Sequence, residues 1–133
     1  MPTIRATVDQ VDNSSSQGRV RGHALVMDRP ESKGGQDKGP MGGEALLLGL
    51  GGCFMSNLLA AAKARDTELI NASLDITGEL ADAPPRYTSV HMRLSAHCGA
   101  PGELAKLCTI AERGCIVANT LRKVLDLRIE CTS

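Results

Sequence analysis

The sequence predicts an α+β fold in which antiparallel sheets pack around one long buried central helix. Stretches of alternating apolar and polar residues, typical of half-buried strands, flank an apolar run at 45–62. The order along the chain is two strands, a helix, two strands, two helices and a strand, and hairpin-length gaps favour antiparallel pairing. With 133 residues, 42% of them hydrophobic and 23% charged, the chain is expected to form a single domain over 1–133.

The N-terminal part is predicted to be a hairpin followed by a loop. Apolar residues alternate with polar ones over 4–9, which indicates a strand, and 20–27 is expected to form the second strand. The polar cluster 13–18 between them favours a turn. Repeated glycine and proline residues make 28–43 a loop.

A long helix is predicted over 43–65. Its polar residues are scattered around the helical wheel, so it is apolar on nearly every side and needs cover all round. One short chain can hardly supply that cover, so we expect an intertwined homodimer. Glycines, Ser56 and Asn57 interrupt the apolar run, which favours a buried core helix over a membrane span of about 20 apolar residues.

The remaining elements follow from their periodicity. Alternation predicts strands over 70–80 and 90–97, joined by the proline-containing segment 83–86. Pro101 opens a helix that ends or kinks at Gly114, and a further helix begins at Cys115. A closing strand is expected over 126–131.

Charge and composition exclude several functions. Fifteen basic residues balance fifteen acidic ones, and the chain has only two aromatic residues, so nucleic acids and anionic membranes are not expected partners. No signal sequence is apparent, and none of the five cysteines forms a Cys-x-x-Cys pair. Free or catalytic thiols in a reducing cytoplasm are therefore expected rather than a disulfide scaffold. Three of the five, Cys98, Cys108 and Cys131, fit structural roles.

Two cysteines are candidates for chemistry. Cys53 lies in the middle of the long helix next to Gly51 and Gly52, which let a substrate or another backbone approach, although simple packing is the competing interpretation. Cys115 begins a helix, where the dipole and free N–H groups stabilise a thiolate. Zinc-type ligand spacings and phosphate-binding glycine motifs are absent from the sequence, so no metal and no cofactor are predicted.

Four segments are together similar to one known family. Residues 28–31 read Asp-Arg-Pro-Glu, 34–40 read Gly-Gly-Gln-Asp-Lys-Gly-Pro, and 44–53 read Glu-Ala-Leu-Leu-Leu-Gly-Leu-Gly-Gly-Cys. Residues 111–121 place a second cysteine 62 positions after the first. Over essentially its whole length the chain resembles the OsmC/Ohr family, in its OsmC-like branch.

The resemblance implies an OsmC-like fold, an intertwined homodimer and thiol-dependent reduction of organic hydroperoxides in oxidative or osmotic stress defence. Cys53 would attack the peroxide and become a sulfenic acid, and Cys115 would resolve it as a disulfide. An external dithiol, often of lipoyl type in the family, would then reduce the disulfide. The alternative is a non-enzymatic OsmC-like module that binds an apolar or acyl ligand, or a redox sensor.

The family also implies a cation at the thiol, an arginine of the N-terminal hairpin held by a glutamate. Arg19 and Arg21 flank Val20 on one predicted strand, and Arg19 is preferred. Glu44 is the candidate glutamate, but nine helical positions place it opposite Cys53 and roughly 13 Å away, so a direct role needs a helix break or a second subunit. Its alternative role is as a first-turn acid.

The remaining candidates concern the substrate pocket and the departures from the family pattern. Phe54, Met41 and Leu50 are the candidate substrate-binding residues, although their helical spacing also suits plain core. Gly43 stands where the peroxidase branches carry their glutamate, and Ile116 follows the second cysteine where many members have proline.

Overall fold

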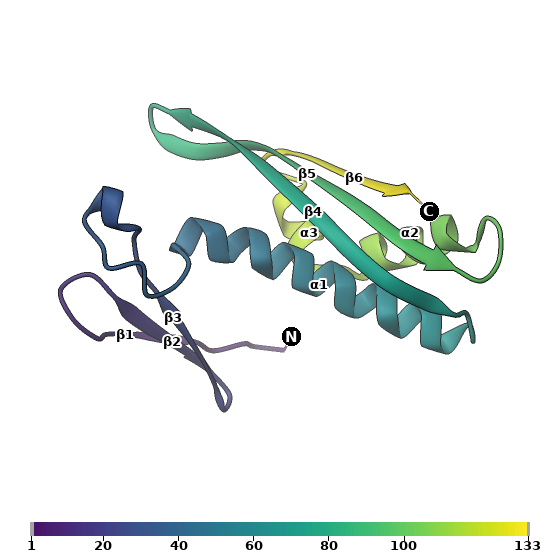
Figure 1. Cartoon of the computed structure of the whole chain (residues 1–133), viewed down its shortest axis with the longest axis horizontal. Helices are drawn as coiled ribbons and strands as arrows, with labels where there is room; N and C mark the ends of the chain where they lie inside the picture. Colours follow the sequence, from purple (N-terminus) through teal and green to yellow (C-terminus); the bar gives the residue numbers. More distant parts are fainter. Residues whose placement is uncertain (1, 133) are drawn as a thin grey trace. The chain divides into compact units, whose positions relative to one another are not determined.

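The computed structural model describes residues 2–132, which form two compact units (Figure 1). The first unit ends at Leu46 and the second begins at Leu47. The α+β fold predicted from the sequence, with two sheets and one long helix, is confirmed.

The first unit contains a three-stranded antiparallel sheet in the order β1-β2-β3. The prediction of two strands here was wrong, because the polar cluster does not all belong to a turn. Asp12 closes a short turn by accepting the N–H groups of Ser14 and Ser15 at 3.0 and 2.8 Å, and the next residues already pair with β1. The strands are β1 (Thr7–Gln10), β2 (Ser16–Val20) and β3 (His23–Met27).

The loop after β3 is organised by a buried carboxylate. Asp28 is 4% exposed and accepts the backbone N–H groups of Arg29, Gln36 and Lys38 at 2.7, 3.1 and 3.3 Å. Burial opposes ionisation, but these three donors hold the pKa of Asp28 below its ordinary value. The segment predicted as loop therefore has a fixed conformation, and it includes a short 3₁₀ helix (Glu31–Lys33).

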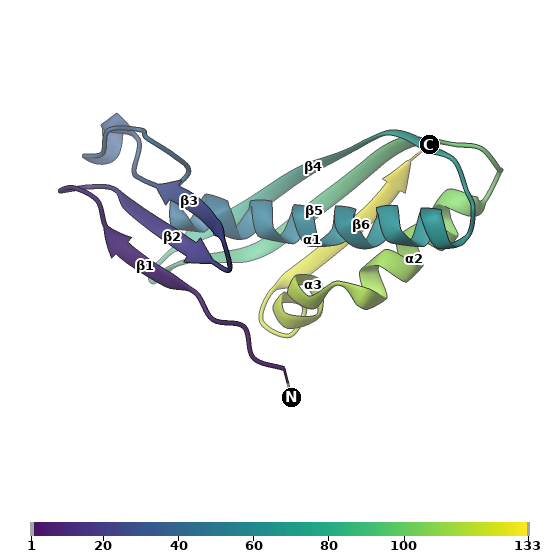
Figure 2. The same ribbon diagram turned by 90° about the horizontal axis from the view of Figure 1, so that it is seen from below.

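The second unit is built on a mixed three-stranded sheet. β4 (Leu69–Asp82) and β5 (Pro85–Cys98) form the predicted antiparallel hairpin. β6 (Asp126–Thr132) pairs with β5 in parallel, which corrects the expectation of a wholly antiparallel sheet. The chain crosses between β5 and β6 through α2 (Glu103–Gly114) and α3 (Ile116–Leu121), and such a helical crossover returns a strand in the same direction (Figure 2).

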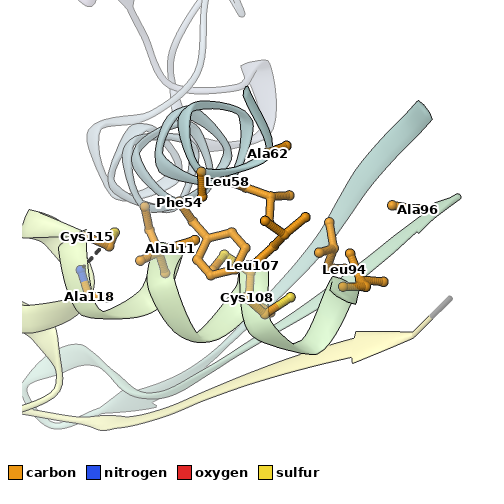
Figure 3. Packing of buried hydrophobic residues seen from close by; sticks show 14 of the residues in the cluster. Phe54, Leu58, Ala62, Leu94, Ala96, Leu107, Cys108, Ala111, Cys115 and Ala118 are labelled. Carbon is orange, nitrogen blue, oxygen red and sulfur yellow. Dashed lines mark hydrogen bonds between the residues drawn. The ribbon is translucent and has the colours of Figure 1, made fainter. Parts of the chain in front are cut away.

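The core of the second unit lies between this sheet and its helices. The long helix α1 (Gly42–Ala64) agrees with the predicted span 43–65 and contributes Phe54 and Leu58. Figure 3 shows these two side chains beside Leu107 of α2 and Leu94 of β5. All four are fully buried, so the inner face of the sheet and one face of each helix share a single apolar interior.

A disulfide crosses the same core. Cys108 of α2 and Cys131 of β6 are bonded, with their Cα atoms 6.9 Å apart. The sequence placed both residues on apolar faces, but the expectation that they act only as separate packing residues was wrong. The two faces pack against each other, so the sulfurs meet.

α1 is not covered on every side by its own chain. Leu48 and Leu59 are 61% and 50% exposed, and they line up with exposed Gly52 and Ser56 at helical spacing. We call these four residues the α1 stripe. Among residues 2–132, α1 alone is long and apolar enough to cross a membrane, and its other face packs in the core.

Candidate thiol site

The structure brings Cys53 and Cys115 together. Cys53 lies halfway along α1 and is half-buried, and Cys115 lies between α2 and α3 and is fully buried. Their side chains are close enough for each to shift the pKa of the other, and neither belongs to a disulfide. Two cysteines 62 positions apart in sequence thus form one dithiol pair.

The break between α2 and α3 positions Cys115. Its backbone is extended, with φ −80° and ψ 110°, so α2 ends at Gly114 and the chain restarts as α3. Cys115 is the N-cap of α3, and its Sγ accepts the Ala118 N–H at 3.4 Å (Figure 3). The cap bond fixes the sulfur at the start of α3 and facing the core.

The surroundings of Cys53 favour its thiolate. Burial raises the pKa of the Cys53 thiol, but the Val117 N–H, the Cys115 thiol and the Ile116 N–H together lower it below the ordinary cysteine value. These backbone donors belong to the first turn of α3. The sulfur of α1 is therefore stabilised as an anion by a neighbouring helix start.

Cys115 is shifted in the opposite direction. Burial raises its pKa, the hydrogen bond and negative charge of Cys53 raise it further, and the Ala118 and Val117 N–H groups only partly oppose them. The sequence correctly placed Cys115 at a helix start, but the expected thiolate is not there. The helix start lowers the pKa of Cys53 instead, because one pair of neighbouring thiols does not readily carry two negative charges.

Asn57 is a site residue that sequence reasoning missed. It lies one turn after Cys53 on α1, and its Nδ2 donates to the Ala111 carbonyl of α2 at 3.4 Å. Its amide also lies close to Gly114, 3.5 Å from where a Cβ would be placed there. This contact holds the end of α2, and hence the residue after it, against α1. The sequence did contain one signal, because Asn57 is a polar residue in an apolar helix. It lies four positions after Cys53, so the two share a helix face.

The predicted substrate-binding residues lie in different surroundings. Leu50 and Phe54 are fully buried among core side chains of the second unit. Met41 belongs to the first unit, where it lines a cleft of about 420 Å³ together with Asp28 and Arg29. Their role in substrate binding remains a prediction.

Two of the three predicted charged residues, Glu44 and Arg19, have partners within the first unit. Glu44 accepts the Met41 backbone N–H at 2.8 Å, which is one half of a capping box at the start of α1. Arg19 is exposed and lies 3.5 Å from Asp9 and 3.2 Å from Gln17. Arg21 is not on the strand face shared with Arg19, because β2 ends at Val20 and Arg21 occupies the turn with φ 57°.

No group of three or more His, Cys, Asp or Glu side chains within residues 2–132 is arranged to hold a metal ion. The candidate site therefore consists of the two thiols, the N–H groups of α3 and Asn57. This donor set can stabilise one sulfur anion and keep a second sulfur ready for disulfide formation.

Comparison with protein families gives one match. The family model described as "OsmC-like protein" matches residues 35–130, which includes both cysteines of the pair. No curated protein matches the chain.

Solved structures match over nearly the whole chain. An OsmC-like protein from Mycoplasma pneumoniae is 20% identical, with a TM-score of 0.85 and 98% of this chain and 96% of that chain covered. An organic hydroperoxide resistance protein from Legionella pneumophila is also 20% identical, with a TM-score of 0.70 and coverages of 100% and 98%. The corresponding protein of Bacillus subtilis is 14% identical, with a TM-score of 0.62 and 98% coverage of both chains.

Proposed function

This chain belongs to the OsmC-like protein family, and from that premise we propose that it is a two-cysteine thiol peroxidase that reduces small organic hydroperoxides. The observation that carries the proposal is the asymmetric pair, in which Cys53 has a lowered pKa and its contact partner Cys115 a raised one. Two of the similar structures are described as organic hydroperoxide resistance proteins, which supports the choice of substrate.

The first step uses the Cys53 thiolate. It attacks the terminal oxygen of the hydroperoxide, a sulfur–oxygen bond forms, and the oxygen–oxygen bond breaks. The alkoxide leaves with the bond electrons and takes up a proton to become an alcohol. Cys53 is oxidised to a sulfenic acid, and the N–H groups of Val117 and Ile116 stabilise the attacking anion beforehand.

The second step follows from the loss of charge on Cys53. Part of what raises the pKa of Cys115 is the negative charge of Cys53 itself. Once Cys53 is a sulfenic acid that charge is gone, so Cys115 loses its proton more easily. Its thiolate attacks the Cys53 sulfur, the disulfide forms, and hydroxide leaves and is protonated to water. The loss of charge at Cys53 therefore makes disulfide formation follow peroxide reduction.

The cycle ends with reduction by an external dithiol. The dithiol donates two electrons to the Cys53–Cys115 disulfide, which restores both thiols and leaves the dithiol oxidised. We expect a lipoyl-type donor, which would reach the bond from the side of half-buried Cys53, because Cys115 is buried. We place this cycle in the cytoplasm, where dithiol reductants are kept reduced. No bound cofactor takes part in these steps.

The proposed active protein is a homodimer of one-domain subunits. The family match crosses from the first unit into the second, which supports treating both as parts of one OsmC-like domain. The exposed α1 stripe supplies an apolar surface with small residues that a second copy would cover. We assign Arg19, with Arg21 as the alternative, to stabilise the developing charge in the completed site, and Glu44 to orient that arginine.

The test treats reduced protein with one equivalent of cumene hydroperoxide and, separately, of hydrogen peroxide, followed by peptide mass spectrometry. We expect rapid formation of a Cys53–Cys115 disulfide, faster with the organic peroxide. Cys53→Ser should abolish oxidation at this pair, and Cys115→Ser should leave a sulfenic acid on Cys53 that dimedone traps. Arg19→Ala and Arg21→Ala are compared at the same pH. The arginine that stabilises the developing charge is the one whose substitution slows the first step.

Retention of both thiols over minutes at this stoichiometry contradicts the peroxidase proposal. Oxidation that is equally fast in denatured protein contradicts it as well, because the folded site would then contribute nothing. In either case the ligand-binding or redox-sensing alternative becomes the working hypothesis.

A further inference from the structure

A second sulfur pair lies apart from Cys53 and Cys115. The Cys108–Cys131 disulfide joins α2 to β6 across 23 positions of sequence, and Cys115 lies within that closed segment. Because β6 also pairs with β5, the bond connects the helix that leads into Cys115 to the sheet. The redox state of this bond therefore affects how firmly α2 is held.

The two sulfurs of the bond differ in access. Cys108 is 7% exposed and packs among the core side chains of α2, including Leu104 and Leu107. Cys131 is half-buried, and it lines a cleft at the end of the sheet. A reagent arriving from solvent thus meets the sulfur of Cys131 first.

The cleft has room for a small thiol. Its volume is about 530 Å³, within the range of pockets that hold small molecules. Small residues, among them Gly99, Ala100, Gly102 and Ala105, leave it open, and the free thiol of Cys98 lines it too. The cleft therefore combines a disulfide sulfur, a free thiol and space for a ligand.

We propose that Cys131 is a site of reversible thiol exchange, at which a small thiol or dithiol opens the Cys108–Cys131 disulfide. The incoming thiolate attacks the Cys131 sulfur and forms a mixed disulfide, while the bond to Cys108 breaks and Cys108 leaves as a thiolate that takes up a proton. A second thiol then attacks the small-molecule sulfur, which releases Cys131 as a thiol and the small molecule as its oxidised form. Two electrons pass from the small thiols to the protein.

Opening the bond removes the covalent link between α2 and β6. α2 ends at Gly114, directly before the N-cap residue Cys115, so the reduced protein holds its resolving cysteine less firmly. Exchange at Cys131 thereby acts as a redox-sensitive control on the geometry of the other pair.

The test compares two variants that lose the same disulfide, Cys108→Ser and Cys131→Ser, in the full chain carrying Cys98→Ser and Cys53→Ser. Cys53→Ser removes the proposed peroxidase cycle, so the outcome does not depend on it. Oxidised glutathione is the probe, and peptide mass spectrometry measures the mixed disulfide. We expect glutathione to attach to Cys131 at least about ten-fold faster than to Cys108, because the thiol of Cys108 is buried.

A second measurement needs no destabilised variant. Wild-type protein is titrated with reduced glutathione, quenched with acid and digested, and the first mixed disulfide is located. We expect it on Cys131, accompanied by a lower thermal unfolding midpoint in the fully reduced protein. A first adduct on Cys108, equal rates in the two variants, or no Cys108–Cys131 disulfide at any glutathione ratio overturns the proposal.

Discussion

At the scale of single residues, the pKa values of Cys53 and Cys115 are shifted in opposite directions, because different groups surround these two neighbouring sulfurs. The first-turn N–H groups of α3 lower the pKa of Cys53. Burial and the neighbouring negative charge raise the pKa of Cys115. A proton is therefore lost from the pair first at Cys53, and the second loss is delayed.

This difference predicts the pH dependence of alkylation. Only thiolates react with iodoacetamide, so each rate rises with pH and levels off above that thiol's pKa. The rate at Cys53 should level off at lower pH than that of a free cysteine peptide, and the rate at Cys115 at higher pH. Site-resolved mass spectrometry over a pH series measures both, and Cys53→Ser should move the Cys115 profile to lower pH. Coinciding profiles contradict the described pair.

Asn57 gives a second prediction at this scale. Asn57→Ala removes the contact between α1 and the end of α2 and should slow disulfide formation after Cys53 is oxidised. The effect expected from one hydrogen bond is about 1 kcal/mol, roughly five-fold in rate. Competition between dimedone trapping and disulfide formation measures it, because a merely less stable protein would not change this ratio.

The matched control is Asn119→Ala. Asn119 also donates to the end of α2, to the Arg113 carbonyl at 3.0 Å, but from an exposed position on α3. It should leave the trapping ratio close to that of the wild type. Equal effects of the two substitutions would mean that Asn57 does not act by joining α1 to α2.

At the scale of elements, α1 packs closely on the sheet at one glycine. A Cβ on Gly51 would lie 2.6 Å from Cδ1 of Ile76 on β4. Gly51→Ala should have two opposing effects on the free energy of unfolding. Overpacking should lower it by about 1–3 kcal/mol. The higher helix propensity of alanine should raise it by roughly 1 kcal/mol. Chemical denaturation measures the net change.

The Ile76→Val substitution tests the cause, since it removes Cδ1. Alone it should cost about 0.5–1.5 kcal/mol. Combined with Gly51→Ala, it should give a protein at least about 1 kcal/mol more stable than the sum of the single changes predicts. Additive effects of the two substitutions would show that contact with Ile76 is not what destabilises the Gly51→Ala protein.

The elements also show how far the sequence could predict the fold. Periodicity located α1 and β4 within two residues and the end of β5 within one, because each repeats its pattern over many residues, but β5 begins five residues earlier than predicted. It missed a strand boundary at Ser16, since polar turn and polar strand residues look alike. It missed the parallel pairing of β6 and the bond from Cys108 to Cys131, because both depend on packing between distant segments.

The candidate site was predicted unevenly for the same reason. Both thiols of the pair were identified, one from its neighbouring glycines and one from the helix start. The direction of the pKa shift at Cys115 was not, because it arises from burial in the folded core and from Cys53, 62 positions away. Asn57 was not identified, because its partner carbonyl on Ala111 has no sequence signature.

At the scale of the whole molecule, the α1 stripe predicts that the chain associates with itself. Leu48→Asp places a charge in the stripe and should dissociate the proposed homodimer, because burying an unpaired carboxylate costs several kcal/mol. Light scattering coupled to size exclusion measures the mass. Leu80→Asp is the control, since Leu80 is 67% exposed on the β4–β5 hairpin and outside the stripe. A wild-type monomer, or a Leu48→Asp dimer, contradicts the assigned interface.

The two sulfur pairs, taken together, have an interleaved connectivity. In chain order the four cysteines are Cys53, Cys108, Cys115 and Cys131, and the fold pairs the first with the third and the second with the fourth. Of these four residues, Cys108 and Cys115 are separated by the fewest positions, so a bond between them would close most readily in an unfolded chain. Oxidation before folding would therefore trap Cys108 with Cys115 and consume one member of each pair. We therefore expect the native pairs to form more readily when the chain folds reduced and is oxidised afterwards.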